Sequence, residues 1–448
     1  MKKFYFLLAM VAVAVTSCQK DVVYNDMPEQ NQSVELPSSN TRSYDEALTI
    51  AEDALKLLES DETRSTTKRV IKRNEGQTVL RPVTRGGEEN DDPIMYVFNN
   101  EDNMGFTVVA ADRSQQPLIA VTEYGNYTYG EPTGVEPFDV YIDQVASQLM
   151  ILPDPIIPLP DVPLEPTPGC IVDTVDIFTR VDPLLTTKWG QYGIYNDLCY
   201  DELSQECPAG CVATAIAQII AYQKHPSQLQ ITFDGDYLGD TLYLNWTNIL
   251  RHTHNIGLHA KCSREHMNIS KLFREIGERV EMKYNPRGSA TSDAKALNFL
   301  KSVGFTSAKW KDGMSYALTK CNLIEGNPVY MGGYRYDAVA KEYYGHAWVA
   351  DGVHDREYGT ILYVSNPNYD PNIIYNNPEP EYIIEESNIQ IERMLHFNWG
   401  YDGDCNGWFA IDNICMKEGV EYDSSTHENN LNRNYEYSMS IIYDIFTW

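Results

Sequence analysis

The sequence predicts an α+β protein built from two folded units. Helix and strand patterns follow one another as helix, strands and helix over residues 44–150, which is typical of a small α+β domain. Residues 151–169 carry seven prolines and no helical period, so we expect an extended connection there. Beyond this connection helical patterns come first and strand patterns follow. A length of 448 residues allows two or three domains with buried cores.

The first unit, residues 44–150, begins with an amphipathic helix predicted from Tyr44 to Glu59. Its apolar stripe consists of Ala47, Leu48, Ala51, Ala54, Leu55 and Leu58. The following elements are strands over Val79–Val83, Met95–Phe98, Gly105–Asp112 and Leu118–Val121, then a helix over Pro137–Leu149. No set of residues in this unit points to catalysis. A carbohydrate- or surface-binding module is one interpretation of it.

The segment before this unit has the pattern of an export signal. Met1-Lys2-Lys3 is basic, and the apolar run from Phe4 to Val15 is too short to span a bilayer. Small residues precede Cys18, which predicts a lipoprotein signal over residues 1–18 with the lipid on Cys18. An ordinary secretory signal is the alternative. Residues 19–43 are polar and predict a disordered tether, so we expect an exported protein, either secreted or held at a bacterial cell envelope.

Residues 151–180 are predicted to be a proline-rich linker and activation region. Exposed linkers are where proteolytic nicking concentrates. Arg180 is a candidate site for a trypsin-type protease near the end of this region. The second folded unit then covers residues 181–448.

A cysteine at the start of a helix is the central feature of the second unit. Pro208 and Gly210 interrupt what precedes, and apolar residues recur at helical spacing after Cys211 until Pro226 ends the run. The helix dipole and the unpaired backbone N–H groups there favour thiolate over thiol, and thiolate is the nucleophile. The alternative is a small buried cysteine that packs the helix start.

The rest of the second unit is predicted to be helical first and antiparallel β afterwards. The expected helices are Asn268–Val280, Ser292–Val303 and Tyr316–Glu325. The expected strands are Pro328–Tyr334, His346–Val353, Thr360–Asn366, Met394–Trp399, Trp408–Ile411 and Tyr437–Tyr443. Asp351-Gly352 predicts a hairpin after the strand that carries His346.

A cysteine nucleophile needs a base and a group that orients the base. His346 is flanked by small residues in a predicted strand, 135 residues after Cys211 (346 − 211). Asn398 and Trp399 end a later strand, and Gln191 follows a Trp-Gly pair before the cysteine. Gln191 is a candidate oxyanion donor. Each residue alone has an ordinary structural interpretation, but the order Gln, Cys, His, Asn favours catalysis. His396 is the next candidate for the base.

The segments that carry these residues resemble the streptopain family of papain-like bacterial cysteine peptidases. The matching segments are Trp189-Gly190-Gln191, Gly210-Cys211-Val212-Ala213-Thr214-Ala215, Gly345-His346-Ala347 and Phe397-Asn398-Trp399-Gly400. The resemblance implies a papain-like catalytic domain over residues 181–448 and an inhibitory propeptide over residues 44–150. It also implies a cleft that prefers an apolar residue two positions before the cut. The sequence Tyr401-Asp402-Gly403-Asp404 departs from the family pattern, which often has further glycines there.

We therefore expect a secreted or lipid-anchored cysteine endopeptidase made as a zymogen. Cys211 is expected to attack the scissile carbonyl, with His346 as its ion-pair partner and general acid. The Cys211 backbone N–H and Gln191 are expected to hold the oxyanion, while Asn398, or the backbone beside it, fixes His346 and Trp399 shields that contact. The alternatives are a Cys-His acyl transferase that acts on amines and a catalytically idle surface-binding protein of the same fold.

Charge and composition narrow the partners. The chain has 64 acidic and 35 basic residues, a formal charge of −29, which argues against nucleic acid and anionic membrane surfaces. We expect protein or peptide substrates, the chain's own propeptide as an intramolecular inhibitor, a monomer, and membrane contact solely through a lipid on Cys18.

No cofactor and no metal is expected. The pattern Asp402-x-Asp404-x-Asn406-Gly407 matches half of an EF-hand loop, but position twelve is Asn413, so a tight glycine turn is the simpler interpretation. Apart from Cys18 and Cys211, the cysteines are 170, 199, 207, 262, 321, 405 and 415. None of the pairs has the C-x-x-C form of a zinc site, and an odd number cannot all be paired, although Cys199 and Cys207 are close enough in sequence to bridge.

Overall fold

The computed structural model describes residues 40–59, 69–81, 92–151, 170–253, 264–337, 342–365, 382–411 and 438–447. The predicted signal with Cys18, most of the tether and the proline-rich residues 152–169 lie outside these ranges. The α+β class is confirmed: helices pack with a large sheet whose strand pairs are all antiparallel. Within the described ranges, no helix has the length and apolar character needed to cross a bilayer.

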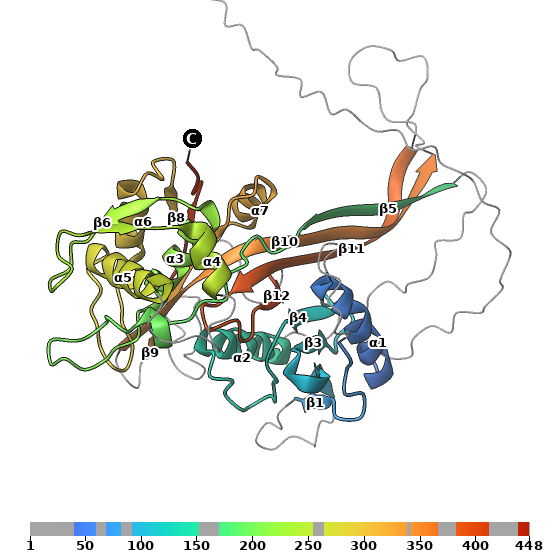
Figure 1. Ribbon diagram of the computed structural model, residues 1–448. Helices are drawn as coiled ribbons and strands as arrows, with labels where there is room; N and C mark the ends of the chain where they lie inside the picture. Colours follow the sequence, from blue (N-terminus) through green and yellow to red (C-terminus); the bar gives the residue numbers. More distant parts are fainter. Residues whose placement is uncertain are drawn as a thin grey trace, which may run out of the picture. The chain divides into compact units, whose positions relative to one another are not determined.

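One antiparallel sheet of eleven strands runs through the described part of the chain (Figure 1). Its order is β1-β2-β3-β4-β12-β11-β10-β9-β13-β8, and β5 pairs with β10. The strands are β1 (Gln77–Leu80), β2 (Pro93–Asn99), β3 (Phe106–Ala110), β4 (Leu118–Thr122), β5 (Cys170–Val181), β8 (Lys309–Asp312), β9 (Val329–Asp337), β10 (Glu342–Ser365), β11 (Tyr382–Asn398), β12 (Gly407–Ala410) and β13 (Ser438–Tyr443).

The N-terminal unit, residues 40–151, contains β1 to β4 and two helices, α1 (Tyr44–Ala54) and α2 (Glu136–Ile151). Single 3-10 turns follow α1 (Leu55–Leu58) and β2 (Glu101–Asn103). Ser43 begins α1 with a capping box in which its hydroxyl accepts from the Glu46 N–H. Ala47 and Ala51 are fully buried against the sheet. The two helices and the strands of this unit are therefore found where the sequence predicts them, except that α1 ends at Ala54, β1 covers Gln77–Leu80, and the predicted residues 82–83 lie outside the described ranges.

The folded part of the N-terminal unit begins earlier than the tether prediction of 19–43 allowed. Arg42 is buried, and its guanidinium donates to the carbonyl oxygens of Ala110 and Asp112. Its backbone N–H donates to the Ala111 carbonyl at 2.7 Å. Residues 40–43 are held by contacts with a strand about 70 residues further along the chain, and such contacts leave no periodic pattern in the local sequence. Their polar composition therefore predicted a tether.

The sheet of the N-terminal unit continues directly into the sheet of the second unit. Strand β4 pairs with β12 in antiparallel register, with Trp408 opposite Val121. Gly407 opens β12, and a Cβ atom there would fall 2.1 Å from the Val121 carbonyl oxygen. Glycine therefore permits the close approach of the two strands. Phe409 also packs against Tyr141 of α2, with ring centroids 5.2 Å apart.

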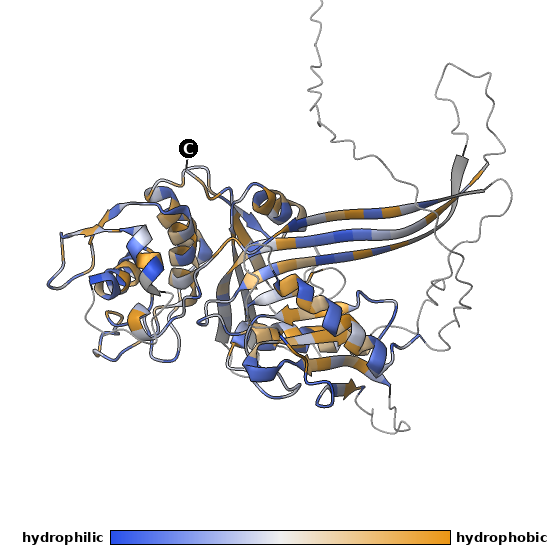
Figure 2. Ribbon diagram, turned by 45° about the vertical axis from the view of Figure 1, so that its right-hand side comes forward, coloured by the Kyte–Doolittle hydropathy of each residue, from blue (hydrophilic) through white to orange (hydrophobic). Residues whose placement is uncertain are grey.

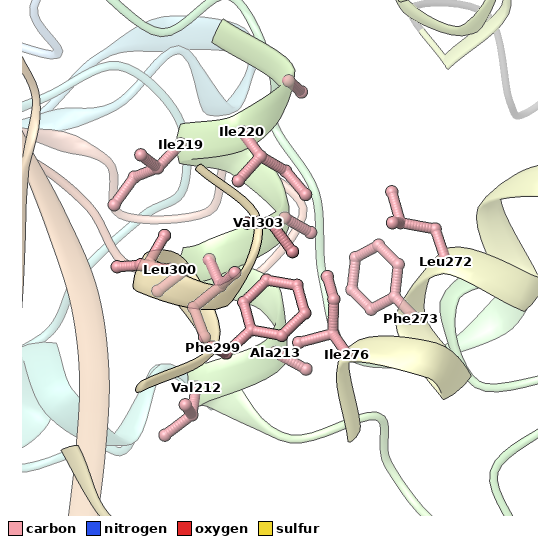
Figure 3. Close-up of a cluster of buried hydrophobic side chains, with 14 of the residues drawn as sticks. Val212, Ala213, Ile219, Ile220, Leu272, Phe273, Ile276, Phe299, Leu300 and Val303 are labelled. Carbon is pink, nitrogen blue, oxygen red and sulfur yellow. The ribbon is translucent and has the colours of Figure 1, made fainter. Parts of the chain in front are cut away.

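The helical half of the second unit has its own apolar core. It contains α3 (Cys211–Gln223), α4 (Trp246–Thr253), α5 (Arg264–Arg279) and α6 (Asp293–Ser302), together with the hairpin of β6 (Gln228–Gln230) and β7 (Thr241–Tyr243). Figure 3 shows side chains of α3, α5 and α6 meeting, among them Ile220, Phe273 and Phe299. The residues at helical spacing that predicted α3 are the ones that it buries. The helix α7 (Tyr316–Ile324) comes later in the chain and contacts β9, β10 and β13.

The largest departure from the sequence prediction is the length of β10. It runs without a hairpin from residue 342 to residue 365, so the strand expected over Thr360–Asn366 is a continuation of the one that carries His346. Asp351-Gly352 forms an irregularity in the pairing with β11 rather than a turn. Figure 1 shows β5, β10 and β11 side by side, and Figure 2 shows hydrophobic and hydrophilic residues alternating along them.

The predicted linker of 151–180 is correspondingly too long at its C-terminal end. Residues from Cys170 to Val181 form β5, in which Arg180 lies opposite His354 of β10. The Arg180 side chain donates to Asp182 and to the Leu57 carbonyl oxygen. A paired strand resists proteolysis, so Arg180 is a poorer activation site than residues 152–169. The strand was missed because its partner residues lie between 172 (Val181 to Val353) and 194 (Cys170 to Val364) residues further along the chain.

Candidate active site

Cys211 is the first residue of α3, where the sequence places it. Gly210 precedes it with φ +95, a conformation that L side chains rarely adopt, and a Cβ atom there would lie 2.8 Å from the Met282 side chain. Its carbonyl oxygen accepts the first hydrogen bond of the helix, from the Thr214 N–H at 3.1 Å. The glycine thus lets the chain turn sharply and present the cysteine at the helix N-terminus.

The surroundings of Cys211 oppose ionisation of the thiol. Burial raises its pKa to about 11, although the backbone N–H groups of Ala347 and Val212 act in the opposite direction. Ala347 directly follows His346 in β10, so the nucleophile helix and the histidine strand meet at the sulfur. The helix N-terminus favours thiolate as the sequence analysis assumed, but desolvation is the larger effect here.

His346 is buried, and its Nε2 lies 2.8 Å from the carbonyl oxygen of Trp399. Because a carbonyl oxygen can only accept, Nε2 carries the proton and donates. In the neutral ring Nδ1 then has a free lone pair, which a general base requires. Burial lowers the pKa of His346 to about 4, and the Trp399 contact raises it in part. The rings of Trp348 and Tyr401 lie beside the imidazole, with centroids 6.2 Å and 5.4 Å from the centroid of the His346 ring.

These two pKa shifts favour a neutral thiol and a neutral imidazole in this conformation. The thiolate–imidazolium pair expected from the sequence stays a prediction, because withdrawal of both groups from water favours their neutral forms in this conformation. The charged pair therefore needs a change in the surroundings of the site.

The side-chain amide of Asn398 is already fully engaged. Its Nδ2 donates to the Thr187 carbonyl at 2.8 Å and to Oε1 of Gln218 at 3.1 Å. Its Oδ1 accepts from Gln218 Nε2 at 3.0 Å and from the Gly400 N–H at 3.2 Å. An amide has two donors and two acceptor lone pairs, so nothing remains for His346. Of the two expectations, the backbone beside Asn398 makes the contact.

Trp399 supplies the backbone carbonyl that accepts from His346, and its indole packs beside the site. Its indole is almost fully buried, with ring centroids 5.4 Å from Trp348 and 5.2 Å from Phe409. Its backbone N–H donates to Oδ1 of Asn406 at 3.0 Å. The peptide units on both sides of Trp399 are therefore fixed.

Gln191 is held close to the nucleophile by its backbone. Its carbonyl oxygen accepts from the Ala209 N–H at 2.9 Å, two residues before Cys211. The Thr214 hydroxyl donates to the neighbouring Gly190 carbonyl at 3.2 Å. The side chain of Gln191 is partly exposed, as a residue that meets a substrate must be. Its segment is thus bonded to Ala209, just before α3, and to Thr214 in the first turn of the helix.

The sequence between Tyr401 and Gly407 forms tight turns. Asp402, Gly403 and Cys405 all have positive φ, and the Asp404 N–H donates to the Tyr401 carbonyl at 2.8 Å. Asn406 uses its side chain to bond the Trp399 N–H. Within the described ranges, no group of three or more His, Cys, Asp and Glu side chains is arranged to hold a metal ion. The glycine-turn interpretation of the EF-hand-like pattern fits this geometry.

Three further buried polar residues lie near the site, and one of them, His396, was the next candidate for the base. His396 of β11 lies with Nδ1 2.6 Å from Asp351 Oδ1 and Nε2 3.4 Å from Glu123 Oε1, and Glu123 comes from the N-terminal unit. Gln218 is the sole amide in the buried stretch of α3, whose other residues apart from Thr214 are apolar, a signal that was missed in the sequence. The Asp293 carboxylate accepts hydrogen bonds from the hydroxyl groups of Tyr330 and Ser440 at 2.7 and 2.6 Å.

Fold and site together define the class: a papain-like arrangement of a helix-borne cysteine and a strand-borne histidine, with an N-terminal α+β unit attached. Comparison with known proteins agrees. A model of the Peptidase C10 family matches residues 189–409, and a model described as Spi protease inhibitor matches residues 38–139. The chain belongs to the streptopain family of cysteine-type peptidases and carries that family's propeptide, the organisation of a zymogen.

The similar proteins are distant in sequence. The thiol protease/hemagglutinin PrtT of Porphyromonas gingivalis is 23% identical over 348 residues, 72% of this chain and 34% of that protein. Streptopain of Streptococcus pyogenes is 22% identical over 367 residues, 74% of this chain and 77% of that protein. Among solved structures, a prointerpain A fragment of Prevotella intermedia matches 83% of this chain and 99% of its own with TM-score 0.50 at 21% identity, which supports the fold.

Proposed function

We propose that this chain is an endopeptidase that cleaves proteins through Cys211 and His346. The observation that carries the proposal is the meeting of α3 and β10, where the backbone N–H beside His346 faces the Cys211 sulfur. Since Nε2 of His346 donates to Trp399, its Nδ1 is the atom that takes the thiol proton. The same nitrogen later returns the proton to the leaving amine.

The oxyanion formed by attack on the scissile carbonyl needs donors close to the sulfur. We assign these to the Cys211 backbone N–H at the start of α3 and to the side chain of Gln191, whose segment is bonded to Ala209. Asn398 and Trp399 have supporting roles: Asn398 shapes the turn, and Trp399 presents the carbonyl that orients His346.

We further propose that residues 40–151 form the inhibitory propeptide and that the catalytic unit begins with β5 at Cys170. The N-terminal unit packs against the turn that holds His346: Val135 and Phe138 share an apolar cluster with Trp399 and Cys405. This contact supports latency, because departure of the N-terminal unit from the turn would let water reach both neutral catalytic groups. We propose that activation cleavage falls in residues 152–169, which lie in the sequence between α2 and β5.

Export and a lipid on Cys18 are part of the proposal on sequence grounds alone, since the residues concerned lie outside the described ranges. The subsite preference for an apolar residue two positions before the cut, and the monomeric state, stay predictions as well.

The test of this function compares three proteins after cleavage of the linker and removal of the N-terminal unit. The unchanged chain and a Cys321→Ala control, which alters an exposed cysteine on α7, should digest casein at equal rates. Cys211→Ala should not digest it. Digestion by Cys211→Ala would overturn the assignment. An added primary amine that becomes joined to the cut peptides in place of water would instead favour the acyl transferase, and absence of any reaction in all three would favour the idle binding protein.

A further inference from the structure

Gln218 occupies a position where a polar side chain is costly. It lies on α3 seven residues after Cys211, two helical turns along the same face, and is completely buried in a stretch of the helix that is apolar apart from Thr214. A buried amide is unfavourable unless its groups are hydrogen-bonded. A hydrophobic residue would fill the position at lower cost, so the contacts of the amide explain its presence.

The amide of Gln218 bonds two separate segments of the site, residues 187–189 and Asn398. Its Oε1 accepts from the Thr187 hydroxyl at 3.0 Å, from the Trp189 N–H at 3.2 Å and from Asn398 Nδ2 at 3.1 Å. Its Nε2 donates to Asn398 Oδ1 at 3.0 Å. Trp189 is two residues before Gln191, and Asn398 is next to the carbonyl that holds His346.

We propose that Gln218 is a positioning residue that sets Gln191 and His346 relative to Cys211. The inference rests on the proposed function, since it assigns no chemistry of its own to Gln218. One rigid helix carries both the nucleophile and the Gln218 amide. The amide fixes the segment that leads to Gln191 and the segment that presents the Trp399 carbonyl to His346. Misplacement of catalytic groups by about 1 Å can lower turnover by about 10²-fold.

The first test removes the amide and keeps the shape. Gln218→Met should lower kcat of the processed enzyme by about 10- to 100-fold and leave KM within about threefold. The matched control is Gln223→Met on the same helix, whose amide donates to the Ile445 carbonyl at 3.0 Å, away from the site. That control should keep kcat within about twofold. Wild-type kcat in a folded Gln218→Met enzyme would reduce Gln218 to a structural residue.

The second test uses Gln218→Glu, which also serves if the methionine variant does not fold. A carboxylate can accept from Thr187, Trp189 and Asn398 but cannot donate to Asn398 Oδ1, whereas the protonated carboxyl can do both. Activity relative to wild type at the same pH should therefore rise as the pH falls. A pH-independent ratio would overturn the proposal. Activity of wild type and of Gln223→Met in the same series shows that the proposed function itself holds.

Discussion

Two buried histidines on neighbouring strands have opposite electrostatic surroundings. His346 of β10 bonds an uncharged carbonyl, and burial lowers its pKa to about 4. Burial also acts to lower the pKa of His396 of β11, but Asp351 and Glu123 outweigh it and raise that pKa to about 9. Burial therefore does not decide the charge of a histidine. The neighbouring carboxylates decide it.

The difference separates a histidine that moves a proton from one that holds charge. A neutral imidazole with a free Nδ1 can accept a proton from a thiol. An imidazolium between two carboxylates carries a proton on both ring nitrogens, so it has no lone pair that can accept another. Burial acts to raise the pKa of Glu123, yet His396 and Lys188 outweigh it and lower that pKa to about 2. His396 thus belongs to an ionic contact between the N-terminal unit and the catalytic unit, and we assign it no part in the chemistry.

The largest expected effect comes from making the same substitution at both histidines. His346→Gln should lower turnover of the processed enzyme by about 10²- to 10⁴-fold, since it removes the general acid and base. His396→Gln keeps a donor for Asp351 and should leave turnover within about threefold. Casein hydrolysis under identical conditions measures both. Equal losses in the two variants would contradict the distinction drawn above.

A smaller loss is expected at the oxyanion donor, which has no ionisable group. Gln191→Ala should lower kcat by about 10²-fold with little change in KM, because one donor to the oxyanion is lost. The pH dependence should match wild type, unlike that of a variant at His346. Gln205→Ala, at an exposed glutamine of the loop before Cys211, is the control and should behave as wild type. A kcat unaffected by Gln191→Ala would remove this residue from the site.

The neutral state of the catalytic pair predicts slow alkylation of Cys211 in the intact zymogen. Release of the N-terminal unit should speed alkylation near neutral pH by at least about tenfold, since each unit by which the thiol pKa falls raises the thiolate fraction about tenfold. The exposed Cys321 provides the reference within the same protein, and its rate should not change. Peptide mapping by mass spectrometry resolves the two sites. Equal Cys211 rates before and after release would show that the N-terminal unit does not keep the pair neutral.

The smallest effect concerns stability against pH. The pKa of His396 is raised, so its contribution is complete below its unfolded value near 6.5 and is lost as the pH rises through about 9. The pKa of Glu123 is lowered, so its contribution is present above about 4.5 and is lost as the pH falls through about 2. Each kcal/mol lost should lower the unfolding midpoint by about 2–4 °C.

This dependence is measured on a Cys211→Ala zymogen, which cannot digest itself. His396→Gln should flatten the curve on the alkaline side, and Glu123→Gln should flatten it on the acid side. If the alkaline decline kept its full size in the His396→Gln variant, the decline would come from another group, and the assignment of charge to His396 would fail.

Local sequence patterns were sufficient for most helices, though not for α4 (Trp246–Thr253), and for the helix start at Cys211. The run of small and apolar residues after Gly210 predicts α3, and the structure starts the helix at Cys211 because a glycine with positive φ precedes it. The strand of His346 and the turn after Asn398 were likewise visible in the chain. These features depend on neighbours within a few residues, which a single sequence displays directly.

Only the tertiary structure decided how these segments act together. The saturation of the Asn398 amide depends on Gln218 and Thr187, which are 180 and 211 residues away. The pairing of β4 with β12 and of β5 with β10 joins strands that no local period connects. The charges of His346 and His396 follow from how completely each is buried and from which distant carboxylates arrive beside it. Residue identity supplies the chemical groups, but their protonation and contacts are set by long-range packing, because desolvation and hydrogen bonding depend on what folds against them.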